Sequence, residues 1–74
     1  MSSDSLTARE LAVLVLVAQG YSDKEIARSL SMARCTVSNH VSVVLLKLHA
    51  KNRAEAAARA VARAIVPAPD DTPA

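Results

Sequence analysis

The chain has 74 residues, which is enough for one small domain. About half of the residues are hydrophobic but only one is aromatic, so the core must consist of Leu, Val, Ile and Ala. A single cysteine, Cys35, excludes an intramolecular disulfide and cysteine-rich metal sites, and it suits the reducing cytosol. No apolar run is long enough to cross a bilayer, and the first residues lack the pattern of a signal peptide. We therefore expect a cytoplasmic protein without a cofactor or a membrane partner.

The net charge of +2 is unevenly distributed along the chain. Between Leu6 and Val66 there are nine Lys or Arg residues and four acidic residues, whereas the two ends carry only acidic charge. A folded part this basic favours a polyanionic partner. A solvated surface explains the same charge equally well, so charge alone does not decide between these readings.

Three segments begin with Ser, Thr or Asn followed three residues later by Glu, namely Thr7–Glu10, Ser22–Glu25 and Asn52–Glu55. This pattern is typical of helix starts, because each of the two side chains accepts a hydrogen bond from the other residue's backbone N–H. We expect an all-α fold of four helices, over Ala8–Gln19, Asp23–Leu30, Arg34–His49 and Arg53–Val66.

Turn residues and tail composition set the expected boundaries. Gly20 should adopt the left-handed conformation just after the first helix, and Pro67 should end the last one. The predicted organisation is a flexible N-terminal arm over residues 1–5, a helical domain over 6–66 and a disordered tail over 67–74.

The stretch from Ser22 to Leu48 is the most informative part of the chain, because two helices joined by a short turn form a helix-turn-helix. In that motif the second helix lies in the DNA major groove. Helical spacing predicts a buried stripe of Val37, Val41, Val44 and Leu48. It puts short polar side chains on the opposite side, at Ser38, Asn39 and Ser42.

No residue pattern indicates an enzyme or a metal site. The chain lacks paired carboxylates, a Ser/His/Asp arrangement and a Gly-rich phosphate loop, since it has one glycine. His40 and His49 are expected to be ordinary helix side chains, and Cys35 an inert small one. We expect no catalytic residue and no metal ligand.

Matches to a known family extend along the whole helical region. They are Leu6-Thr7 with Arg9-Glu10, Val13-Leu14, Ala18 to Gly20, Ser22, Lys24 to Ala27, Leu30, Thr36-Val37, His40-Val41 and Lys47-Leu48. Together they resemble the LuxR-type DNA-binding domain of quorum-sensing and NarL-like regulators, over about Leu6 to Ile65. Region four of sigma factors shares the first part of the pattern, but His40-Val41, Lys47-Leu48 and Asn52 to Ala56 favour the LuxR type.

The resemblance implies a domain that binds DNA as a homodimer, with the third helix reading the major groove and the fourth forming the dimer contact. It implies base-reading roles for Ser38, Asn39 and Ser42. Asn39 is the strongest candidate, because a carboxamide can bond adenine in a bidentate way. Phosphate contacts are implied for Lys24, Arg34, Thr36, His40 and Lys47.

Two departures from the family pattern concern the recognition helix. Ser38 and Ser42 stand where several family members carry Lys or Arg, so readout should depend less on charge and more on bridging water. Ala33 stands where a capping Ser is common. Either Ser31 takes over the cap, or the start of the helix frays until DNA orders it.

The outer faces of the first and last helices each allow two readings. The fourth helix carries a stripe of Glu55, Arg59 and Arg63, and its opposite side carries Ala57, Val61, Ala64 and Ile65, which could form a dimer seam or pack against the first helix. The first helix is apolar on all sides, which suits either a protein partner or scattered small surface residues.

The sequence therefore predicts a DNA-binding transcriptional regulator that acts as a homodimer on double-stranded DNA. The alternative is a protein-interaction module of the same fold. Such a module would pair with another regulator or with RNA polymerase and would bind DNA weakly or not at all.

Overall fold

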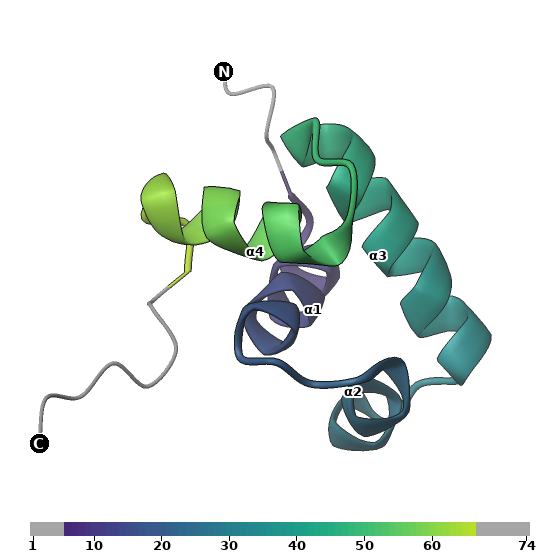
Figure 1. Ribbon diagram of the computed structural model, residues 1–74. Coiled ribbons are helices and arrows are strands. Elements are labelled where there is room, and N and C mark those ends of the chain that lie inside the picture. Colours follow the sequence, from purple (N-terminus) through teal and green to yellow (C-terminus); the bar gives the residue numbers. More distant parts are fainter. Residues whose placement is uncertain (1–5, 67–74) are drawn as a thin grey trace, which may run out of the picture.

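The computed structural model describes residues 6–66, which form four helices. They are α1 (Ala8–Ala18), α2 (Asp23–Leu30), α3 (Arg34–Leu48) and α4 (Arg53–Ala62). This range contains no strand, so the predicted all-α fold is confirmed. α1 lies in the middle and packs against each of the other three helices (Figure 1). The arm predicted over residues 1–5 and the tail predicted over 67–74 lie outside the described residues.

Reciprocal capping bonds start α1 and α2, as predicted. Thr7 Oγ1 accepts from the N–H of Glu10 at 3.1 Å, and Glu10 Oε1 accepts from the N–H of Thr7 at 3.0 Å. Ser22 and Glu25 make the same pair of bonds at 3.2 and 2.8 Å. Two otherwise unpaired N–H groups are satisfied at each helix start.

α3 and α4 begin at the predicted residues, but neither has the reciprocal pair of capping bonds. At α4, Asn52 Oδ1 accepts from the N–H of Glu55 at 2.8 Å, but the Glu55 carboxylate accepts from the N–H of Lys51 instead of that of Asn52. At α3 the N-cap residue is Ala33, with no side-chain hydrogen bond. Ser31 does not replace it, because Ser31 is the left-handed residue that ends α2.

α2 ends at the predicted residue, and α1 and α3 end one residue before the predicted ones. Gly20 adopts a φ of +89°, as expected after α1. The predicted continuation of α4 to Val66 is wrong, because the helix ends at Ala62. Ala64 turns the chain with a φ of +58°, and Val66 is then buried in the core beside α1 and α4. Burial of the Val66 side chain therefore outweighs the helix propensity of the alanine-rich run.

Two connected groups of buried side chains form the core, and α1 contributes to both. Leu14 and Ala18 pack with residues of α3 and α4, whereas Val13 and Val17 pack with α2 and α3. The predicted stripe of α3 is confirmed, because all four of its members are buried: Val37, Val41, Val44 and Leu48. None of the helices in residues 6–66 has the length and apolar character to span a membrane.

Candidate nucleic-acid interface

The outer edge of α3 is exposed along its length. Ser38, Asn39 and Ser42 all point away from the buried stripe and are exposed. Their hydroxyl and carboxamide groups can both donate and accept hydrogen bonds, as the edges of bases in a major groove require. The same edge carries Cys35 at its start and Leu46, which is 75% exposed, near its end. α3 therefore offers a polar, unobstructed surface between two less polar side chains.

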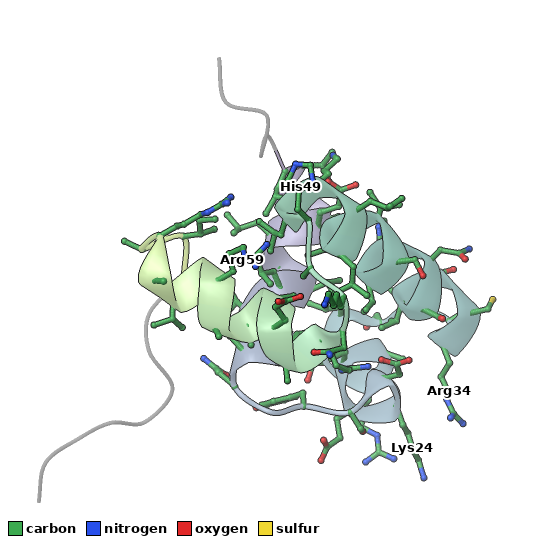
Figure 2. All side chains as sticks on the ribbon, turned by 45° about the horizontal axis from the view of Figure 1, so that its top comes forward. Lys24, Arg34, His49 and Arg59 are labelled. Carbon is green, nitrogen blue, oxygen red and sulfur yellow. The ribbon has the colours of Figure 1, made fainter. Side chains whose placement is uncertain are left out.

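Cationic side chains border the N-terminal end of this edge. Figure 2 shows Lys24 from α2 and Arg34 from the first turn of α3 extending away from the body of the molecule in the same direction. Both are exposed, as is Thr36 in the same first turn of α3. Charged side chains with this placement can contact phosphates beside a groove occupied by α3.

Arg28 is an additional cation that the sequence analysis did not single out. It lies one turn after Lys24 on α2, and the two line an open surface hollow together with Ser22 and Glu25. The spacing of four residues between Lys24 and Arg28 was the available signal, because such residues share one face of a helix. α2 therefore presents two cations on the face that carries Lys24.

Lys47 differs from the other predicted phosphate contacts, because its ammonium group binds a carboxylate of the same domain. Its Nζ lies 2.7 Å from Oε1 of Glu10, which is the buried charged residue of the described part. This hydrogen bond, together with that from the N–H of Thr7, holds the pKa of Glu10 below its usual range. The half-buried His40 lies on the same side of α3 and adds a weaker electrostatic effect in the same direction.

The exposed face of α4 is apolar. Ala57, Ala58, Val61 and Ala62 line an open hollow of about 410 Å³ together with Ala18 of α1. Ala57 and Val61, two of the predicted dimer residues, thus lie side by side at this surface. The other two, Ala64 and Ile65, lie beyond the end of α4 in the turn that follows it, and Ile65 packs against the core. Ala56 and Ala60 are the fully buried residues of α4, and Ala57 and Val61 are half-buried and also pack against the core.

Comparison with known protein families gives one match. Residues 4–60 match the family described as bacterial regulatory proteins, luxR family. The chain is a member of the luxR family. Its luxR-family helix-turn-helix consists of α2 and α3, and this membership supports DNA-binding transcription regulation as the function of the domain.

Two relatives of this luxR-family chain are regulators. It is 51% identical over 57 residues to the transcriptional regulatory protein DesR of Bacillus subtilis, a match that covers 77% of this chain and 29% of DesR. It is 43% identical over 53 residues to the response regulator protein VraR of Staphylococcus aureus, covering 72% of this chain and 25% of VraR. The chain thus spans less than a third of the length of these relatives.

The luxR-family match covers every predicted DNA contact and Ala57, and it ends before Val61. Within residues 6–66, no group of three or more His, Cys, Asp or Glu side chains is placed to hold a metal ion. The positions of interest in this luxR-family domain are therefore the exposed edge of α3, the cations of α2 and the apolar face of α4.

Proposed function

We propose that the chain binds double-stranded DNA sequence-specifically as a homodimer, with α3 in the major groove. The exposed edge of α3 carries the proposal, because Ser38, Asn39 and Ser42 are accessible there next to the cations Lys24 and Arg34. Polar side chains read base edges, while the flanking cations bind phosphates and fix the register of the helix.

The apolar hollow on α4 supports the homodimer. Alanine side chains let two helices approach closely, and Val61 adds a larger apolar group to the same surface. Two copies joined there by a two-fold axis would present two α3 helices to half-sites about one helical turn of DNA apart.

Selection of binding sites from random double-stranded DNA by the purified 74-residue chain tests the proposal. We expect an enriched, two-fold symmetric sequence whose affinity falls steeply as salt rises, because phosphate contacts release counterions. No measurable binding at low salt would contradict the proposal and would favour the protein-interaction module.

Asn39→Ala tests the base-reading assignment. The variant should lose about 1–3 kcal/mol of discrimination at one base position while keeping its binding to phosphates, because only the bidentate carboxamide is removed. Binding measured across single-base variants of the selected site checks this. An unchanged ranking of those sequences would show that Asn39 does not read a base.

Val61→Glu tests the dimer seam. Two like charges brought together on an apolar surface should prevent association, so sedimentation should show monomers and affinity for a two-half-site DNA should fall. Glu at the exposed Ala54 of the same helix is the matched control and should leave the dimer intact. A dimer that persists in Val61→Glu would refute the assignment of this face.

A further inference from the structure

Arginine side chains connect α4 to both helices of the helix-turn-helix. Arg53 donates from Nη1 to Oδ1 of Asp23 at 2.6 Å and from Nη2 to the carbonyl oxygen of Tyr21 at 3.1 Å, which holds the start of α2. Arg59 donates from Nη1 to the carbonyl oxygens of Leu48 and His49 at 2.9 and 2.7 Å, which holds the end of α3. α4 is thus attached by side chains to the two elements that face the DNA.

The Arg59 bonds use groups that a helix end leaves unpaired. The last carbonyl oxygens of α3 have no partner within the helix, and they form the negative end of its dipole. A guanidinium bound to two of them is a charge-assisted contact of fixed geometry. Glu55 holds the guanidinium from the other side, with its Oε2 3.4 Å from Nη2 of Arg59.

The side chains that α4 buries against α3 are small. α4 contributes only Ala56 and Ala60 as fully buried side chains, and both pack with Leu48 and Val44 of α3. Methyl groups form shallow ridges, which leave a crossing angle less well defined than larger interdigitating side chains would. The directional bonds of Arg59 add a constraint on how the two helices lie.

Arg59 lies far from the end of α3 that carries the phosphate-facing cations. Figure 2 shows Arg59 and His49 at one end of α3, and Arg34 and Lys24 at the other. α3 has 15 residues and is therefore about 22 Å long. Arg59 is therefore too distant to share the phosphates that Lys24 and Arg34 are proposed to contact, but it can influence the orientation of α3.

We propose that Arg59 is a positioning residue that sets which separation of DNA half-sites the protein accepts. The inference rests on the proposed function, a dimer joined through α4 that places two α3 helices on two half-sites. In such a dimer the distance between the two α3 helices follows from the angle between α3 and α4. Arg59 holds that angle, so it restricts the spacing without contacting DNA.

The experiment measures binding of the full chain to the duplex selected above, and to duplexes whose half-sites are moved closer or further apart by one or two base pairs. Wild type should prefer the selected spacing. Arg59→Gln should reduce that preference about fivefold or more, with the dimer and the slope of affinity against salt unchanged. Lys51→Gln, the same charge change at an exposed residue just before α4, is the control and should keep the preference of wild type.

A purely structural role makes a different prediction. If Arg59 only stabilised the fold, Arg59→Gln would lower affinity equally at every spacing, and that result would overturn the inference. Arg59→Lys keeps the charge but cannot bond the carbonyl oxygens and Glu55 from two separate nitrogens, so it should show an intermediate preference. This variant serves if Arg59→Gln melts below the assay temperature. If Arg59→Gln were monomeric in sedimentation, the inference would also be overturned, because Arg59 would then act at the seam.

If wild type selected no duplex with two half-sites, the proposed function itself would be refuted.

Discussion

At the first turn of α3, Cys35 and Thr36 are exposed and no side chain caps the helix, whereas at its last turn Leu48 is fully buried and Arg59 binds two carbonyl oxygens. The polar edge predicted to read DNA begins at the first turn. Val37 in the first turn is also fully buried, among side chains of α1 and α2, whereas Leu48 in the last turn is buried among side chains of α1 and α4. Judged by these capping bonds, the first turn of α3 is its weakly held end and the last turn is its firmly held end.

Lys47→Met should have the largest effect at the firmly held end. The change leaves the buried Glu10 carboxylate without its cation, and we expect a loss of about 1–3 kcal/mol in the free energy of unfolding at pH 7. Because Lys47 lowers the pKa of Glu10 in the folded state, its contribution is complete above the usual carboxyl pKa of 4.5 and disappears as pH falls through the lower folded value.

Denaturant titrations of wild type and Lys47→Met between pH 3 and pH 7 measure this difference. It should shrink below about pH 4.5. Adding Glu10→Gln to Lys47→Met should recover part of the lost stability, because no buried charge then remains unpaired. A loss of equal size at pH 3 and pH 7 would mean that Lys47 stabilises the fold by something other than its ion pair with Glu10.

Ala33→Ser should strengthen the weakly held end. The backbone of Ala33 already has the extended conformation of an N-cap, with φ −71° and ψ 148°, and lacks only a side-chain acceptor. The hydroxyl should raise the free energy of unfolding by about 1 kcal/mol. Thermal melts monitored by circular dichroism check this, with Ala54→Ser inside α4 as a control that should not stabilise. An unchanged melting temperature would show that the first turn is already held by other contacts.

His49→Gly should have the smallest effect. His49 ends α3 with a φ of +56°, a conformation that costs a residue with a Cβ about 1 kcal/mol or somewhat more. Glycine removes that cost but adds freedom to the unfolded chain, so we expect a net gain below about 1 kcal/mol. The carbonyl group that accepts from Arg59 is retained in this variant. A loss of stability in the same melts would show that the imidazole itself makes a stabilising contact.

Local signals in the sequence predicted most of the fold. Thr7 with Glu10 and Ser22 with Glu25 identified the starts of α1 and α2 because both partners of each cap lie within four residues. The end of α4 was missed because no glycine marks Ala64 as left-handed, and the turn depends on where Val66 can be buried. That outcome depends on residues distant in the sequence.

The candidate site was predicted less completely for the same reason. Helical spacing was enough to place Ser38, Asn39 and Ser42 on the exposed edge of α3. It could not reveal that Lys47 pairs with Glu10, 37 residues away, or that Arg59 reaches the end of α3. Such contacts depend on how the helices cross, which local spacing does not determine. The roles of all these residues toward DNA remain predictions.

Six of the ten residues of α4 are alanine, including the two buried ones and most of those around the apolar hollow. Alanine has no rotamers to lose, so burying it costs no side-chain conformational entropy. This matters for a domain this small, with no disulfide and little apolar surface to bury. The loss of conformational entropy opposes folding, and alanine makes that loss smaller. Association of a second chain on the opposite side of α4 would likewise cost little side-chain conformational entropy, because no long side chain would have to be immobilised there.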